Sequence, residues 1–296
     1  MTAIDVKDLR KAYGQVQAVR GVSFSVAEGE VFGLLGPNGA GKTTIAEILE
    51  GYRKRDSGEV SVLGVDPRAG GRRWRERIGI VLQEAEVPPT LSVRELVDLY
   101  RGFYPSPRPA AEVIDLVGLT EKTNARVRTL SGGQKRRLDV ALGLVGNPEL
   151  IFLDEPTTGF DPGARRSAWE LVRSLRQLGT TIVLTTHYMD EAQHLADRIC
   201  VVAQGQVVAT GTPDTLRGSA QHRTLIRFTP PDGVDIATLP VQATVQDGVA
   251  TIDTTTPTRT VHEVTAWALQ HNLELAGLEV ARPSLEDVYL ELTGDE

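Results

Sequence analysis

Short apolar runs alternate with segments of helical periodicity along the first two-thirds of this chain. Buried strands are predicted at four of these runs, residues 31–35, 78–82, 150–153 and 181–186. Apolar residues recur at helical spacing in four further segments, residues 92–103, 109–119, 132–145 and 164–178. Strands that alternate with helices predict an α/β fold with a mostly parallel sheet, which binds ligands at the carboxyl ends of its strands.

The two ends of the chain follow a different pattern. Residues 4–30 predict two or three strands with polar turns, one of which holds Tyr13, and residues 57–65 predict another strand. After about residue 218 the pattern predicts a small α+β domain. Its elements are strands at 223–228, 241–245, 249–252 and 273–280 and helices at 260–271 and 285–292. We therefore predict two domains, residues 1–218 and 219–296.

A glycine-rich segment follows the first buried strand. It reads GPNGAGKTT and matches the pattern G-x-x-x-x-G-K-[ST], and apolar residues then recur at helical spacing up to Gly51. A strand, a glycine turn and a helix N-terminus gather backbone N–H groups and partial positive charge, which suit a phosphate chain. Lys42 adds a charge for the β- and γ-phosphates, and the Thr43 hydroxyl is a ligand for Mg²⁺. The segment predicts a nucleoside triphosphate site formed by Gly36, Pro37, Asn38, Gly39, Ala40, Gly41, Lys42, Thr43 and Thr44.

Polar residues follow the ends of the other buried strands. They are Gln83 after the second strand, Asp154 and Glu155 after the third, and His187 after the fourth. Two adjacent carboxylates are poorly explained by structure alone, because one must point inward and buried charges are seldom left unpaired. Since parallel strands end at one edge of a sheet, we expect these residues to lie near the phosphate loop.

A second helix start carries small and polar residues in the sequence LSGGQ, residues 130–134. Ser131 is the predicted N-cap of the helix that follows. A helix N-terminus with small residues is again suited to an anion, which makes these residues candidates for phosphate binding. The candidates are Ser131, Gly132, Gly133 and Gln134.

Charge and composition argue against a nucleic-acid partner. The chain has a net charge of −7, and residues 221–296 hold 4 basic and 12 acidic residues with no lysine. Four arginines surround Trp74 and are interpreted as solvated or as facing acidic groups; they are Arg72, Arg73, Arg75 and Arg77. The single cysteine, Cys200, lies in an apolar run and is interpreted as a core thiol. No run approaches 18 apolar residues, so we expect any membrane-spanning part to be a separate chain.

The phosphate loop, LSGGQ, the strand IFLDEP and the histidine, in this order and at these separations, resemble the nucleotide-binding subunit of ABC transporters over residues 1–220. The resemblance implies a P-loop NTPase fold with a mostly parallel sheet, an antiparallel β subdomain and a helical subdomain at about residues 84–148. It also implies ATP and Mg²⁺ as cofactors.

The resemblance implies a role for each site residue. Mg²⁺ would be held by Thr43, Gln83 and Asp154, and the catalytic residues would be Glu155 as general base with Lys42, Gln83 and His187. Tyr13 would stack on the adenine, and Asp161 would lie at a subunit interface. Ser131 and Gly133 would contact the γ-phosphate bound to an opposite subunit, so a homodimer is expected.

Two further segments, HYMDEAQHLADRI at 187–199 and SLEDVYLELTG at 284–294, are similar to the ATPases of daunorubicin-resistance-type drug exporters. This implies a separate integral membrane permease subunit and a place at the cytoplasmic face of the cell membrane. The alternatives are the ATPase of an ABC importer and a soluble ABC ATPase without a transport role. A soluble member usually carries two cassettes or a long coiled-coil insertion, and neither pattern is visible in this sequence.

Overall fold

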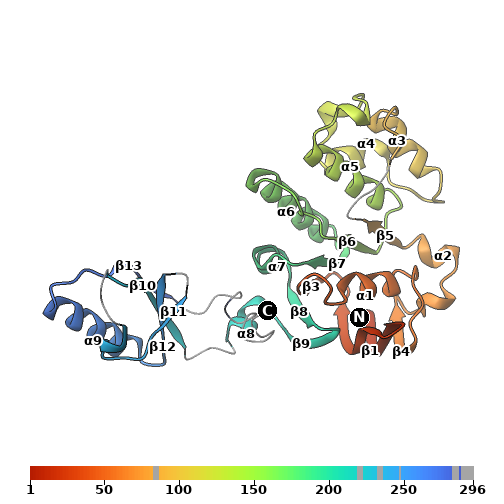
Figure 1. Ribbon diagram of the computed structural model, residues 1–296. Coiled ribbons are helices and arrows are strands. Elements are labelled where there is room, and N and C mark those ends of the chain that lie inside the picture. Colours follow the sequence, from red (N-terminus) through yellow and green to blue (C-terminus); the bar gives the residue numbers. More distant parts are fainter. Residues whose placement is uncertain (83–86, 219–222, 232–235, 247, 282–286, 288–296) are drawn as a thin grey trace. The chain divides into compact units, whose positions relative to one another are not determined.

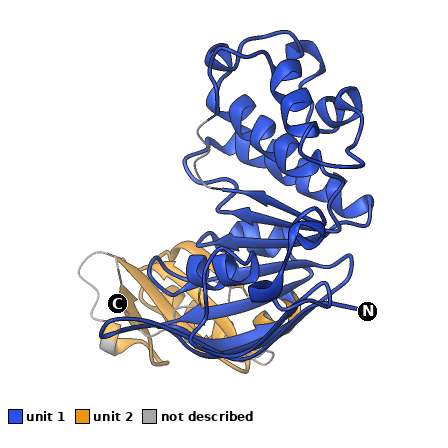
Figure 2. Cartoon of the chain, turned by 90° about the vertical axis from the view of Figure 1, so that its right-hand side faces the viewer, with its two compact units in different colours: residues 1–213 blue, residues 214–296 orange. Residues whose placement is uncertain are grey.

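The computed structural model describes the whole chain except residues 83–86, 219–222, 232–235, 247, 282–286 and 288–296 (Figure 1). The chain divides into two compact units, residues 1–213 and residues 214–296 (Figure 2). Among the residues that the structure describes, no helix has the length and apolar character needed to cross a bilayer.

A six-stranded sheet forms the centre of the first unit, with strand order β5-β6-β7-β3-β8-β9. The strands are β3 (Val31–Leu35), β5 (Ile78–Val81), β6 (Leu150–Asp154), β7 (Thr181–Thr186), β8 (Arg198–Ala203) and β9 (Gln206–Gly211). The first five in this order pair parallel, and β9 pairs antiparallel with β8. The predicted mostly parallel sheet is therefore confirmed, and β6, β7 and β3 end side by side.

Both faces of this sheet are covered, which explains why its strands are continuous apolar runs. Every residue of β3 and β7 is buried. Ile182 and Leu184 join one apolar cluster while Val183, between them, joins the cluster on the other face. The helices of this unit that continue from the strands are α1 (Lys42–Leu49), α6 (Pro162–Gln177) and α7 (Met189–Leu195).

A second, antiparallel sheet has strand order β2-β1-β4. Residues 4–30 form two long strands, β1 (Thr2–Tyr13) and β2 (Val16–Ala27), and β4 follows at Ser57–Val62. Gly21, which has a φ of 88°, lies inside β2 at an irregular part of the register, so the glycine does not end the strand. Tyr13 closes β1 and pairs with Val16, so its predicted place in a turn is wrong.

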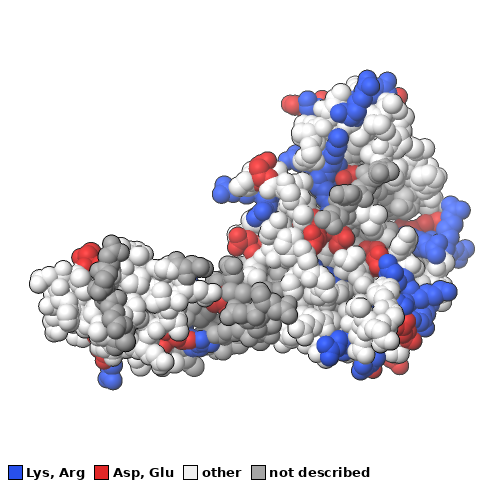
Figure 3. Space-filling model, in the orientation of Figure 1, with Lys and Arg blue, Asp and Glu red and all other residues white. Residues whose placement is uncertain are grey.

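The arginine-rich segment forms the short helix α2 (Arg72–Arg75). Trp74 is buried, and its indole N–H donates to the Val62 carbonyl at 2.9 Å. Arg72 pairs with Glu76, and Arg77, just past the helix, pairs with Glu149. Basic side chains gather over this region of the surface (Figure 3). The interpretation of these arginines as solvated or paired with acidic groups is confirmed.

Three helices pack together in the middle of the sequence: α3 (Val93–Arg101), α4 (Ala110–Leu116) and α5 (Gly132–Leu144) (Figure 1). Helix α5 also lies against β5 at very short range. A Cβ on Gly79 would be 2.3 Å from the carbonyl oxygen of Gly143, and a Cβ on Gly143 would be 2.8 Å from Val81 Cγ2, so neither position has room for a side chain. Single 3₁₀ turns occur at Pro67–Ala69, Thr120–Lys122 and Val127–Thr129.

The second unit holds a four-stranded antiparallel sheet with order β11-β12-β10-β13. The strands are β10 (Thr224–Thr229), β11 (Thr244–Gln246), β12 (Val249–Thr254) and β13 (Ala276–Ala281), and the helices are α8 (Pro213–Gly218), α9 (Pro257–Gln270) and a 3₁₀ turn at Ile236–Thr238. Phe228, Ile252 and Val264 contribute to a core between the sheet and α9. Nearly all of the helix predicted at 285–292 lies outside the described residues.

Cys200 confirms its interpretation as a core residue. It lies in β8, is fully buried, and pairs in the sheet with Leu34 and Thr210. Burial raises the pKa of its thiol to about 11, so it is protonated at neutral pH.

Candidate nucleotide site

The phosphate loop connects β3 to α1 at the carboxyl edge of the large sheet. The Gly36 N–H donates to the Thr186 carbonyl at 3.3 Å, which fastens the loop to the end of β7. Inside the loop, the Ala40 N–H donates to the Pro37 carbonyl at 3.2 Å. Helix α1 begins at Lys42, so its unpaired N-terminal amides and its partial positive charge lie at the loop.

Two glycines of the loop are required by close contacts with neighbouring strands. A Cβ on Gly36 would be 2.2 Å from the Val202 carbonyl oxygen of β8. Gly41 has a φ of 104°, and a Cβ there would be 2.4 Å from the Ala18 carbonyl oxygen of β2. The loop is thus held between β2 and β8 before any ligand arrives, as a preorganised anion site requires.

Lys42 is buried inside this loop. Its Nζ donates to the carbonyls of Gly36 at 2.7 Å and Pro37 at 3.0 Å. Burial lowers the pKa of the Lys42 ammonium, and the nearby Glu155 and Asp154 raise it in part. The loop therefore carries a buried cation within electrostatic range of two carboxylates.

The two carboxylates lie at the end of β6, beside β7. Thr185 of β7 donates its hydroxyl to Asp154 Oδ1. The same hydroxyl oxygen accepts from the Glu155 N–H at 3.1 Å, and the Thr185 carbonyl accepts from that N–H at 3.1 Å. These contacts hold Glu155 at a φ of 43°, a left-handed conformation that costs about 1–3 kcal/mol for a residue with a side chain. Strain of this kind concentrates at functional sites.

The Glu155 carboxylate is also fixed in direction. The Thr158 hydroxyl donates to its Oε2 at 3.0 Å, and His187 Nδ1 lies 3.2 Å from its Oε1. Loop, carboxylates and histidine therefore meet at the ends of β3, β6 and β7, where the alternating pattern predicted them. An anionic ligand, a hard cation and a carboxylate base fit this arrangement chemically.

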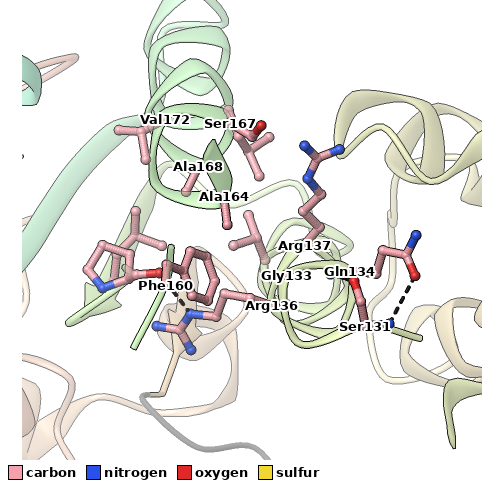
Figure 4. Close-up of a pocket in the computed structure, with 14 residues that line it drawn as sticks. Ser131, Gly133, Gln134, Arg136, Arg137, Phe160, Ala164, Ser167, Ala168 and Val172 are labelled. Carbon is pink, nitrogen blue, oxygen red and sulfur yellow. Dashed lines mark hydrogen bonds between the residues drawn. The ribbon is translucent and has the colours of Figure 1, made fainter. Parts of the chain in front are cut away.

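The LSGGQ segment starts α5, as predicted. Ser131 Oγ accepts from the Gln134 N–H at 3.3 Å, and Gln134 Oε1 accepts from the Ser131 N–H at 3.0 Å, which is a capping box. Figure 4 shows both residues, with Gly133, at a cavity of about 250 Å³ between α5 and α6. This cavity contains no residue of the phosphate loop, so the structure of one chain does not bring the two helix starts together.

Tyr13 and Asp161 have partners of their own. The Tyr13 ring is 40% exposed, with the Arg53 guanidinium 5.2 Å and Lys11 Nζ 5.4 Å from its centroid. Asp161 caps α6, because its Oδ1 accepts from the N–H groups of the residues two and three positions later. Gln83 lies outside the described residues.

The sequence pattern did not single out four residues that shape the site: Thr185, Thr158, Arg136 and Glu50. For Thr185 the sequence did hold a signal: β7 ends in two threonines, Thr185 and Thr186, and polar residues in a buried strand need hydrogen-bond partners. Arg136 and Glu50 lie in helical segments whose sequence carries no such signal.

Comparisons with known proteins agree with this geometry. The ABC transporter family profile matches residues 19–158, and the profile described as "ABC transporter domain-containing protein-like, C-terminal domain" matches residues 224–284. The Nod factor export ATP-binding protein I of Rhizobium etli is 40% identical to this chain over 304 residues, which span 100% of this chain and 95% of that protein. The chain belongs to the ABC transporter ATP-binding family.

Other relatives give the same result. A linearmycin resistance ATP-binding protein of Bacillus subtilis is 37% identical over 98% of both chains. A daunorubicin resistance ATP-binding protein of Streptomyces coeruleorubidus is 37% identical over 100% of this chain and 97% of its own.

Solved ATP-binding cassettes match the first unit of this ABC protein. One described as dimeric and bound to ADP and phosphate matches with a TM-score of 0.63 and 27% identity over 71% of this chain and 98% of its own. Another, in an ADP conformation, has a TM-score of 0.65 and 26% identity over 73% of this chain and 92% of its own. The predicted ABC ATPase fold is confirmed, and this chain is a nucleotide-binding ATPase.

The ABC protein also has a groove of about 970 Å³ beside β5, lined in part by Glu50, Trp74, Leu82, Tyr104 and Asp139. Burial, with smaller contributions from Asp154 and Glu47, raises the pKa of the Glu50 carboxyl to about 7. Burial likewise raises the pKa of Asp139 to about 6, against the opposing effect of Arg136. Ionisation of these carboxyl groups near neutral pH therefore lowers the free energy of unfolding.

The Glu50→Gln variant is expected to be more stable than the parent at pH 8 and nearly equal to it at pH 5. Between pH 4.5 and 7 the folded protein holds a proton on Glu50 that the unfolded chain has released, so stability falls as pH rises. Replacing the carboxyl by an amide abolishes this loss, which amounts to about 1–3 kcal/mol in the free energy of unfolding at pH 8. Melting temperatures at both pH values measure it. The exposed Glu121→Gln is the control, and equal melting temperatures of Glu50→Gln and the parent at pH 8 would contradict the expectation.

Proposed function

We propose that this chain is the ATP-hydrolysing subunit of an ABC exporter that moves a drug, an antibiotic or another hydrophobic compound through a separate membrane subunit. The observation that carries the enzymatic part is the buried Lys42 in its glycine loop beside Asp154 and Glu155. Export is supported by the printed names of the relatives, which describe Nod factor export and resistance to linearmycin and daunorubicin. These substrates belong to those proteins.

In the proposed site, Gly36 to Thr44 bind the triphosphate through backbone N–H groups, and Lys42 turns its ammonium from the loop carbonyls to the β- and γ-phosphates. Tyr13 stacks on the adenine. The Thr43 hydroxyl and the Asp154 carboxylate, with Gln83, are the hard oxygen ligands that suit Mg²⁺. Bound there, Mg²⁺ neutralises charge on the phosphate oxygens.

Glu155 is the proposed general base. It takes a proton from the attacking water, while Thr158 and His187 hold its two oxygens in place. Through this contact with Glu155, His187 is also the proposed residue that orients the γ-phosphate. Because phosphoryl transfer depends on position and charge more than on covalent steps, these fixed directions account for most of what the protein contributes.

Glu155→Gln is expected to bind ATP as tightly as the parent and to lose turnover by about 10²–10⁴-fold, because the amide keeps the shape and cannot accept the proton. Nucleotide titration and single-turnover hydrolysis measure the two effects separately. The exposed Glu59→Gln serves as control. Undiminished hydrolysis by Glu155→Gln would remove Glu155 from this role.

A homodimer completes the proposed site. In one chain the LSGGQ start of α5 lines the cavity against α6, and no residue of the phosphate loop lines that cavity. We propose that Ser131, Gly133 and Gln134 of one copy bind the γ-phosphate held by the loop of a second copy, with Asp161 at the interface. A related cassette described as a dimer with ADP and phosphate supports this arrangement. ATP then closes the dimer, and hydrolysis releases it.

The Glu155→Gln protein is expected to become a dimer in MgATP, and the added substitution Ser131→Ala is expected to prevent this. Ser131→Ala also removes a helix cap worth about 1 kcal/mol. Ser92→Ala is the matched control, because Ser92 makes the same capping box at α3, away from the proposed interface. Size-exclusion chromatography with light scattering gives the masses. If Glu155→Gln still dimerises in MgATP after Ser131→Ala is added, the proposed contact between Ser131 and the γ-phosphate of the second copy is wrong.

The membrane subunit is proposed to contact the groove at Glu50 and Leu82, next to Gln83, at the cytoplasmic face of the membrane. Coexpressed with candidate membrane subunits, the chain is expected to copurify in membranes with one of them and to show an ATPase activity that responds to transported compounds. An importer would instead need a substrate-binding protein. Activity and solubility unaffected by any such membrane protein would favour the soluble alternative.

A further inference from the structure

Arg136 lies in α5 two positions after Gln134 and is 7% exposed. Its guanidinium donates to three backbone carbonyls, which come from two segments far apart in the sequence. Nη2 donates to the Asp154 carbonyl at 2.7 Å, Nε to the Pro156 carbonyl at 3.3 Å, and Nη1 to the Leu82 carbonyl. Figure 4 shows the Arg136 side chain, which extends from α5 and lines the cavity.

The three carbonyls have a common relation to the catalytic centre. Asp154 and Pro156 are the residues immediately before and after Glu155, and Leu82 immediately precedes Gln83. One planar group therefore joins the helix that begins at Ser131 to the backbone on both sides of the proposed base. The fork of a guanidinium can do this in fixed directions, which an ammonium cannot.

Glu155 needs such support. Its φ of 43° is a disfavoured conformation that persists only where the surroundings hold it in place. Thr185 holds its N–H from the β7 side. Arg136 holds the neighbouring carbonyls from the α5 side.

The position of α5 is already secured by apolar contacts such as those of the buried Leu138. A buried guanidinium is an unfavourable way to hold the helix further, because hydrogen bonds must offset the free energy of removing its charge from water. Its orientation toward the carbonyls around Glu155 indicates a role in the geometry of that residue.

We propose that Arg136 is a positioning residue that transmits the position of the LSGGQ helix to Glu155. When the γ-phosphate bound by a second copy contacts Ser131 and Gly133, α5 shifts toward it. The Arg136 guanidinium then moves the peptide groups on either side of Glu155. Hydrolysis thereby depends on a completed dimer. This inference rests on the proposed role of Glu155 as general base.

The test compares Arg136→Lys with the parent in ATP titration, steady-state hydrolysis and dimerisation. A single ammonium cannot span the three carbonyls, so kcat is expected to fall about tenfold or more. ATP affinity and KM are expected to change less than about twofold, because the three carbonyls that Arg136 binds lie outside the phosphate loop. Arg94→Lys is the control: this arginine pairs with Asp98 on the surface of α3, and its kcat is expected to stay at the parent value.

Dimerisation separates positioning from simple fastening. In the Glu155→Gln background, Arg136→Lys is expected to leave the MgATP midpoint for dimer formation within about threefold. A kcat of Arg136→Lys equal to that of the parent overturns the inference. A parallel loss of kcat and dimerisation also overturns it, because Arg136 would then only support the start of α5 at Ser131. If Arg136→Lys does not fold, Arg136→Gln, which keeps two donors, is measured by the same criteria. Active Glu155→Gln would instead refute the proposed function, whichever result Arg136→Lys gives.

Discussion

The desolvated ammonium of Lys42 beside the Asp154–Glu155 pair is the interaction on which the rest of this molecule depends. Buried or half-buried charges of this kind need hydrogen-bond partners, and Gly36, Pro37 and Thr185 supply them for Lys42 and Asp154. Gly36 and Pro37 directly follow β3, and Thr185 lies in β7. The strand order of the large sheet is thus the condition for the site, because any other neighbour of β7 would separate the charges.

Local pattern was sufficient to predict four strands of the large sheet (β3, β5, β6 and β7), the phosphate loop and the cap at Ser131, while β8 and β9 were not predicted. Each predicted feature is determined by residues adjacent in sequence, such as the apolar run of β3 before the glycines. The turn expected at Tyr13 failed because pairing with Val16 extends β1, and pairing is a property of two segments. Arg136 was not predictable for a similar reason, since its carbonyl partners are 18 to 54 residues distant.

The second unit illustrates the same limit on a smaller scale. The strands and the helix expected between residues 223 and 280 occur in the predicted order, and α9 and β10 are displaced from their predicted limits by only a few residues. The predicted run 241–245, by contrast, becomes the shorter strand Thr244–Gln246, all of it exposed at the edge of the sheet. A short exposed edge has little apolar burial to fix its limits, and pairing with β12 decides them.

The single thiol of this chain has a practical consequence. Cys200 is enclosed in β8 and stays protonated well above neutral pH, so it is a poor nucleophile toward alkylating reagents in the native protein. A cysteine engineered on the surface would therefore be labelled alone, without first replacing a native residue. Spectroscopic distances between two labelled copies could then be recorded on an otherwise unaltered sequence.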